Sequence, residues 1–253
     1  MTYELHHGDC LDVLPTLAAG SVDAAIADIP SGRTQCAWDS VMPLEDMWRE
    51  LRRVIKPRGA IVLLGLTQPF TSVLVCSNPK MFRYEWVWDK VNRPTGHLNS
   101  SHRPLHITES ICVFSLSRSI YNPQMQEGKP YRAISSGKKS GNYGAQKDKI
   151  ITINEGLYHP RNLLSIPADE RGRAGRLHPT QKPQPLLEYL VKTYTNEGDT
   201  VLDFCAGSGT CGAACGNLNR RFIGIERDET YFNIASERIA AAYAPLAAME
   251  RAS

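Results

Sequence analysis

The stretch Val201-Leu-Asp-Phe-Cys-Ala-Gly-Ser-Gly-Thr210 decides the fold. Its apolar start predicts a strand over Thr200–Phe204, its glycines predict a tight turn, and Thr210–Leu218 has the periodicity of a helix. A strand that enters a helix through a glycine turn is a ligand-binding unit of open α/β sheets. The stretch therefore predicts an α/β fold with a ligand at the turn.

The rest of the chain supplies further strands and helices of such a sheet. Apolar runs predict strands at Tyr3–His6, Ala24–Ile29, Ala60–Leu64, Tyr84–Trp88, Ser110–Phe114 and Arg221–Ile225. Helical patterns lie at Leu44–Ile55, Pro69–Cys76, Pro185–Tyr194 and Glu229–Ala242. This alternation indicates a mostly parallel sheet of about seven strands, with helices on both faces.

The glycine stretch and the residues around it indicate which ligand this turn binds. The glycines fit G-x-G-x-x-G and Glu226 follows at the distance of a ribose-binding acid, so a nicotinamide dinucleotide is one candidate. However, Asp203 would approach a pyrophosphate, and its charge better suits a cation such as the amino group of a methionine moiety. The chain also ends at Ser253, too soon after Glu226 for the remaining strands. A circularly permuted sheet that binds S-adenosylmethionine is therefore favoured.

A candidate catalytic loop follows the strand Ala24–Ile29, at Asp28-Ile-Pro-Ser-Gly32. An acid at the carboxyl end of a parallel strand points into the crevice where such sheets bind ligands. Asp28 and a neighbouring carbonyl could accept the hydrogens of an exocyclic amine, and Pro30 stiffens the turn. Taken alone, this sequence is also typical of an ordinary turn.

The segment His178-Pro-Thr-Gln-Lys-Pro183 enters the predicted helix Pro185–Tyr194. The N–H groups of a first helical turn can hold an anion, such as a cofactor carboxylate, with Thr180 and Lys182 as helpers. An ordinary helix start is the alternative.

Basic residues are concentrated between Ser117 and Arg176, where eleven Lys and Arg stand against five Asp and Glu. This segment interrupts the α/β pattern, so we expect an insertion that touches a polyanion, with a solvated basic loop as the alternative. Candidates for phosphate contact or base readout are Lys138, Lys139, Lys147, Arg161, Arg171, Arg173 and Arg176. Upstream, Asn92–His102 and His106–Glu109 are candidates for lining the target pocket.

Composition excludes several classes of protein. No apolar run approaches the roughly 18 residues of a membrane span, and Met1–Cys10 lacks an export signal, so a cytoplasmic protein is expected. The seven cysteines have neither Cys-x-x-Cys pairs nor zinc spacing, so no metal is expected.

Together, these segments resemble the β-class amino-methyltransferases of DNA, including their phage and prophage members. That family places an Asp-Pro-Pro-Tyr-like motif first, then a target-recognition insertion, then His-Pro-Thr-x-Lys-Pro and Phe-x-Gly-x-Gly. The same order occurs here as Asp28–Ser31, the basic insertion, His178–Pro183 and Phe204–Gly209. The resemblance implies a Rossmann-like methyltransferase domain over residues 1–116 and 177–253, with recognition by residues 117–176.

The resemblance also implies site residues and partners. S-adenosylmethionine would contact Asp9, Cys10, Asp28, His178, Thr180, Lys182, Asp203, Phe204, Ala206, Gly207, Ser208, Gly209, Glu226 and Arg227. Double-stranded DNA would be the substrate, as in restriction-modification, and a homodimer is expected. The catalytic loop would comprise Asp28, Pro30 and Ser31, with the target base flipped out of the duplex.

The catalytic loop departs from the family pattern at Ser31, where an aromatic residue normally stacks on the flipped base. Such stacking contributes about 1–3 kcal/mol per base, so Trp38 or another ring would have to substitute. Asp28 favours adenine N6 as the target, and cytosine N4 is the alternative. Ser31 leaves open a third hypothesis, a catalytically impaired DNA-binding protein with the methyltransferase fold.

Overall fold

The computed structural model describes residues 2–32, 41–91, 93–135, 150–168 and 181–252. The chain forms two compact units, one of residues 1–122 and 162–253 and the other of residues 123–161. The second unit is shorter than the predicted insertion of residues 117–176, because residues 117–122 and 162–168 belong to the first unit.

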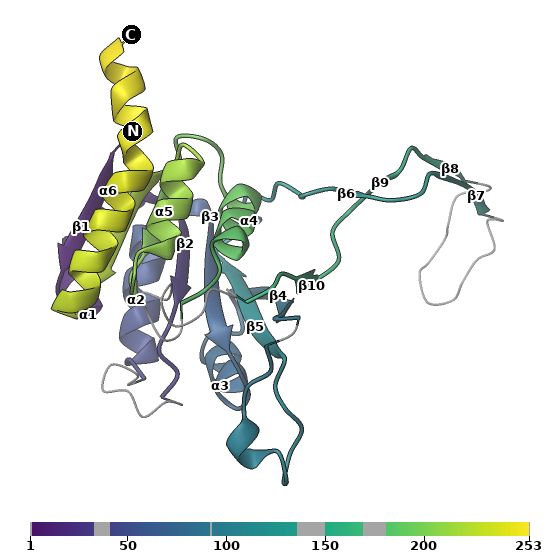
Figure 1. The fold of residues 1–253 in the computed structure, drawn as a ribbon, viewed down its shortest axis with the longest axis horizontal. Coiled ribbons are helices and arrows are strands. Elements are labelled where there is room, and N and C mark those ends of the chain that lie inside the picture. The colour runs from purple at the N-terminus through teal and green to yellow at the C-terminus, as the bar shows by residue number, and fades with distance from the viewer. Residues whose placement is uncertain (1, 33–40, 92, 136–149, 169–180, 253) are drawn as a thin grey trace. The chain divides into compact units, whose positions relative to one another are not determined.

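The first unit is built on an eight-stranded sheet in the order β1-β12-β11-β2-β3-β5-β4-β10 (Figure 1). All neighbouring strands are parallel except the two pairs that involve β5. The predicted α/β class with a mostly parallel sheet is confirmed, with one strand more than the seven expected. The strands are β1 (Tyr3–His7), β2 (Val22–Asp28), β3 (Ile55–Leu66), β4 (Phe82–Asp89), β5 (Thr108–Ser115), β10 (Leu163–Ser165), β11 (Thr200–Asp203) and β12 (Arg221–Glu226).

Helices cover both faces of this sheet, and each predicted helix is present. Figure 1 shows α4, α5 and α6 together in front of the strands. The α-helices are α1 (Cys10–Val13), α2 (Leu44–Val54), α3 (Phe70–Ser77), α4 (Gln184–Tyr194), α5 (Thr210–Asn217) and α6 (Glu229–Ala252), and the 3-10 helices are η1 (Leu14–Thr16) and η2 (His97–Asn99). Within the described residues, none of these helices combines the length and apolar character required to span a bilayer.

The strand β2 shows why the sheet needs helices on both sides. Ala24 and Ile26 belong to the apolar core beneath α4, α5 and α6, whereas Ala25 and Ala27 belong to the core beneath α2 and α3. All four side chains are fully buried. Successive side chains of a strand point to opposite faces, so a strand buried on both faces is apolar throughout.

The strand order confirms the permutation expected from the glycine stretch. The late strand β11 pairs with the early strand β2, with Val201 opposite Ala24, and β12 pairs with β1. The carboxyl ends of β2 and β11 are therefore neighbours. This pairing brings Asp28 and Asp203, which end these strands, to the same edge of the sheet.

The second unit contains two short antiparallel pairs, β6 (Gln126–Glu127) with β9 (Leu157–Tyr158) and β7 (Tyr131–Ser135) with β8 (Ile150–Asn154). The Gly156 N–H donates to the Asn154 side chain at 2.7 Å, and Gly156 has a φ of 101°. Asn154, with a left-handed glycine two residues later, closes the turn between β8 and β9.

Candidate functional site

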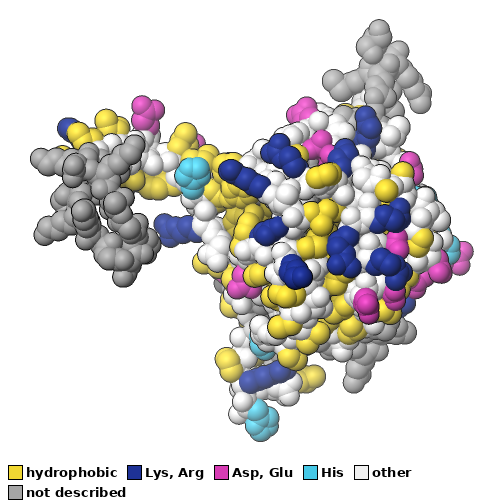
Figure 2. Space-filling model, turned by 180° about the vertical axis from the view of Figure 1, so that it is seen from behind, with side chains coloured by type: hydrophobic (Ala, Val, Ile, Leu, Met, Phe, Trp, Pro, Cys, Tyr) yellow, Lys and Arg dark blue, Asp and Glu magenta, His cyan; other side chains and the backbone are white. Residues whose placement is uncertain are grey.

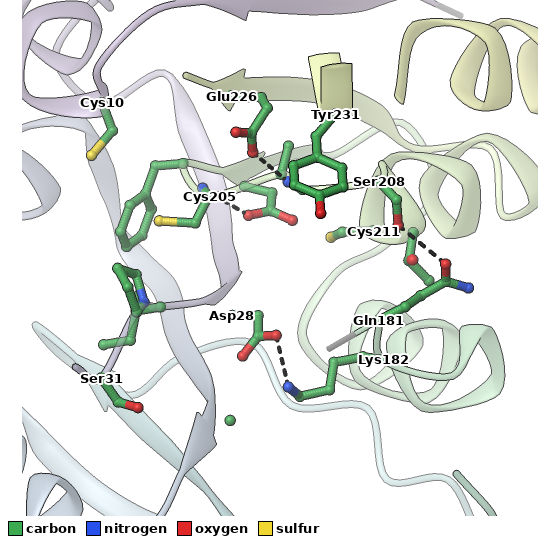
Figure 3. Close-up of a pocket in the computed structure, with 18 of the residues that line it drawn as sticks. Cys10, Asp28, Ser31, Gln181, Lys182, Cys205, Ser208, Cys211, Glu226 and Tyr231 are labelled. Carbon is green, nitrogen blue, oxygen red and sulfur yellow. Dashed lines mark hydrogen bonds and ion pairs between the residues drawn. The ribbon is translucent and has the colours of Figure 1, made fainter. Parts of the chain in front are cut away.

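A cavity of about 540 Å³ lies at the carboxyl ends of β1, β2, β11 and β12. Its size falls within the roughly 300–1,000 Å³ of small-molecule sites. Figure 3 shows Asp28 and Lys182 on one side of the cavity and Glu226 on the other. The predicted residues that line it are Asp9, Cys10, Asp28, Pro30, Ser31, Lys182, Asp203, Phe204, Ala206, Gly207, Ser208, Glu226 and Arg227.

One described residue among the predicted cofactor contacts, Gly209, is not part of this lining. Gly209 instead caps α5 with a φ of 75°, and a Cβ there would lie 2.9 Å from the Ala235 Cα. Its role is thus to let α5 and α6 pack closely. Two further predicted cofactor residues, His178 and Thr180, fall outside the described residues.

The turn at Gly207 borders open space and also orients the carboxylate of Glu226. A Cβ added to Gly207 would meet nothing within 4 Å, so the turn borders open space. The Gly207 N–H donates to Glu226 Oε2 at 2.7 Å, and the Asp228 N–H donates to Oε1 at 2.8 Å. These bonds fix the Glu226 carboxylate at the end of β12, where it can accept from hydroxyl groups of a ligand.

Asp203 is a buried acid whose side chain accepts from the Cys205 N–H at 3.1 Å. The residue is 5% exposed. Burial raises the pKa of Asp203 to about 8, and the negative charges of Asp28 and Glu226 also raise it, while the Cys205 N–H lowers it. A cationic group placed in the cavity would supply the counter-charge that this carboxylate lacks among the described residues.

Asp28 is held at the end of β2 by an ion pair. The Lys182 ammonium donates to Asp28 Oδ2 at 2.7 Å. On the neighbouring strand β3, Gly65 has a φ of 73°, and a Cβ at this position would lie 2.1 Å from Asp28 Oδ1. Any larger residue at position 65 would therefore displace the carboxylate.

The ion pair continues into a chain of alternating charges. Lys182 Nζ lies 3.6 Å from Glu109 Oε2, and Lys90 Nζ donates to Glu109 Oε1 at 3.1 Å. Burial opposes the charge on Glu109, but Lys182 and Lys90 outweigh it and lower its pKa. Burial likewise opposes the charge on Lys182, yet Asp28 and Glu109 raise its pKa. The arrangement keeps Lys182 cationic beside Asp28.

Ser31 lines the cavity without offering a ring for stacking. Rings in the lining come from Trp88, Phe204 and Tyr231, of which Trp88 and Phe204 are buried. Trp38, the substitute considered from sequence, lies outside the described residues.

Sequence reasoning missed several residues of the cavity and located others only by segment. Lys90, Trp88 and Tyr231 were not foreseen, and Gln181, which accepts from the Ser208 hydroxyl at 3.3 Å, was located only within the segment His178–Pro183. A lysine directly after strand β4, whose Trp86 and Trp88 are buried, was the available signal for Lys90. Arg93, Thr95 and Glu109 fall in the two segments proposed upstream of the insertion.

Of the predicted DNA-contacting residues, Arg161 is exposed in the second unit. The others lie outside the described residues: Lys138, Lys139, Lys147, Arg171, Arg173 and Arg176. Basic side chains also occur on the first unit, where Figure 2 shows many of them and where Arg58 and Arg83 are exposed. Among the described residues, no cluster of three or more His, Cys, Asp or Glu could hold a metal ion.

The family model for N6 and N4 methyltransferases, described as DNA methylase, matches residues 29–237. The chain belongs to this DNA methylase family. Type II methyltransferase M2.DpnII of Streptococcus pneumoniae is 28% identical, over 94% of this chain and 89% of that protein. M2.LlaDCHI of Lactococcus lactis subsp. cremoris is also 28% identical, over 93% and 88%.

Solved structures of methyltransferases share the fold of this DNA methylase. The crystal structure of the M1.HpyAVI–SAM complex has a TM-score of 0.64 and 26% identity, over 94% of this chain and 99% of that one. The cytosine-N4-specific PvuII methyltransferase has a TM-score of 0.67 over 96% and 92%, with 15% identity, which supports the fold alone.

Proposed function

We propose that this DNA methylase transfers a methyl group from S-adenosylmethionine to the exocyclic N6 amine of an adenine flipped out of a specific sequence in duplex DNA. One observation carries the proposal. Asp28, paired with Lys182, and the buried acid Asp203 end neighbouring parallel strands and line one cavity. One carboxylate can orient an amine while the other binds a cationic cofactor.

The cavity fits S-adenosylmethionine group by group. Asp203 would pair with the methionine ammonium, and Glu226 would accept from the ribose hydroxyls. Asp9 and Cys10, which line the cavity near β1, would contact the adenine of the cofactor. The open space at Gly207 leaves room for the rest of the cofactor. When bound, the cofactor supplies an electrophilic methyl group on a sulfonium.

The protein's own contribution is to orient the acceptor nitrogen and take its proton. Asp28 accepts an N–H of the exocyclic amine, which withdraws the nitrogen lone pair from the base and makes it available for attack. The Lys182 ammonium pairs with Asp28 and fixes the position of its carboxylate. The nitrogen gains a methyl group and loses a proton, which the Asp28 carboxylate would accept.

DNA binding is assigned to the basic segment of residues 117–176, with the methyltransferase domain formed by residues 1–116 and 177–253. Exposed Arg161 and the lysines and arginines named above would contact phosphates and base edges. A cytoplasmic homodimer is part of the same proposal, and equilibrium sedimentation of the protein with and without DNA tests the dimer.

Labelled S-adenosylmethionine and unmethylated DNA test the proposed reaction. We expect label in N6-methyladenine after nucleoside analysis by mass spectrometry, no label with Asp28→Ala, and continued transfer with Ser31→Ala. Label in N4-methylcytosine would instead establish the alternative target base. Cofactor and DNA binding without any transfer by the wild-type protein would favour the impaired DNA-binding protein and overturn the enzymatic proposal.

A further inference from the structure

The antiparallel ribbon β7–β8 of the second unit has one distinct face. Ile134 pairs with Ile151 across the two strands, and Arg132 pairs with Ile153. Directly opposed residues of an antiparallel pair point to the same side, and alternate residues of one strand share a side. Arg132, Ile134, Ile151 and Ile153 therefore share one face, which we call the isoleucine face, whereas Thr152 lies on the other.

The isoleucine face is exposed. Ile134, Ile151 and Ile153 are 62%, 54% and 70% accessible. Three adjacent β-branched apolar side chains on a two-stranded ribbon are costly to leave in water, and such a ribbon is marginally stable until its apolar face is covered. This combination indicates a surface that binds a partner.

Charge and size favour DNA over a second copy of the chain as the partner. Residues 123–161 contain seven Lys and Arg against three Asp and Glu, so this unit attracts a polyanion and repels its own copy. Three isoleucine side chains also offer far less than the roughly 800 Å² per partner of a stable protein interface. In contrast, the major groove of B-DNA admits a two-stranded β-ribbon.

We propose that the isoleucine face enters the major groove of the substrate DNA and packs against thymine methyl groups. The C5-methyl of thymine is the apolar group that base edges present in that groove. Arg132, on the same face, is placed to contact a base edge or phosphate beside it. This inference rests on the proposed function, because it takes duplex DNA as the substrate.

Removal of the thymine methyl groups tests the inference. A DNA fragment that the wild-type protein methylates is amplified with either thymidine or deoxyuridine triphosphate, which gives two duplexes of one sequence. Binding is measured by fluorescence anisotropy for the wild type, for Ile151→Thr/Ile153→Thr and for Thr152→Ser. Threonine keeps the β-branching that suits a strand, and Thr152→Ser is the matched control on the opposite face.

We expect the wild type and Thr152→Ser to bind the uracil duplex about fourfold more weakly for each thymine methyl group that the isoleucine face covers. The isoleucine variant should bind the thymine duplex more weakly and discriminate little between the two. Equal binding of both duplexes by the wild type, or unchanged discrimination in the isoleucine variant, would overturn the inference. So would conversion of a wild-type dimer to a monomer by the isoleucine substitutions, which would identify a second copy as the partner.

Methyl transfer to the thymine duplex separates this inference from the proposed function. If transfer is normal but the two duplexes bind equally, the isoleucine face has another role while the methyltransferase proposal stands. If no transfer to any DNA occurs, the proposed function itself fails, and the inference fails with it.

Discussion

The Lys182 ammonium lies 2.7 Å from Asp28 Oδ2, although the two residues are 154 positions apart in the sequence. Asp28 ends β2, and Lys182 shortly precedes α4. The segment His178–Pro183 was predicted to bind an anion at the start of a helix. Through Lys182, the same segment also positions the candidate catalytic carboxylate of Asp28. Lys182 has a second acidic neighbour in Glu109, so it neutralises two carboxylates at once.

Replacement of Lys182 by methionine should lower methyl transfer by about tenfold or more, because the charge-assisted bond that orients Asp28 is removed. The substitution also leaves Asp28 and Glu109 without the cation between them, so the pH profile of kcat should move to higher pH. Lys192→Met, at an exposed position of the helix α4 that follows Lys182, is the matched control and should behave as wild type. An unchanged pH profile in the Lys182 variant would contradict the role assigned to this ion pair.

Gly65→Ala should abolish most methyl transfer, because the added Cβ would lie 2.1 Å from Asp28 Oδ1. Gly198→Ala is the control, since Gly198 has a similar φ of 81° but nothing within 4 Å of the added Cβ. Both variants carry the backbone strain of a left-handed residue, about 1 kcal/mol, which thermal unfolding measures. Only the Gly65 variant should lose activity; equal activities in the two variants would show that the space beside Asp28 is unimportant.

Cofactor binding should depend on the ionisation of Asp203. Its pKa of about 8 means that most molecules are neutral at this position near pH 7. A bound ammonium favours the ionised form, so affinity for S-adenosylmethionine should rise with pH and level off above about pH 8. Calorimetry in two buffers of different ionisation enthalpy should detect proton release at neutral pH. Binding without proton release would show that Asp203 does not face the cationic group.

Asp203→Asn should stabilise the ligand-free protein while it weakens cofactor binding. The folded-state pKa is raised from 3.8 to about 8, so the stability of the wild type is highest below the unfolded pKa and falls as pH rises from the unfolded pKa toward the folded one. At neutral pH, the asparagine variant should gain about 1 kcal/mol or more in the free energy of unfolding. Denaturant unfolding at acidic and neutral pH checks this, because the gain should disappear at acidic pH.

The fold was largely predictable because the central strands β2, β3 and β11 carry apolar runs and are followed by helices of clear periodicity. The permutation was predictable from the order of the motifs, because the candidate catalytic loop Asp28–Ser31 precedes the glycine stretch Phe204–Gly209 in the sequence. Many predicted site residues follow strands β1, β2, β11 and β12, and parallel strands bring such positions together at one edge.

The parts of the structure that were not predicted depend on strand pairings, which leave no signal in the local sequence. The three-residue strand β10 is too short for a periodicity, and it joins the sheet only by pairing with β4. Lys90 and Glu109 meet because β4 and β5 are antiparallel neighbours, with Trp88 opposite Glu109. The isoleucine face likewise exists only once the register of β7 and β8 is known.

The position of β11 between β2 and β12 has a consequence for how the protein is made. During synthesis, β2 and the candidate catalytic Asp28 emerge early, but their neighbour β11 is translated only after the whole second unit. A nascent chain therefore cannot assemble the cavity until Glu226 has left the ribosome. Truncated translation products should therefore be inactive at every length short of β12.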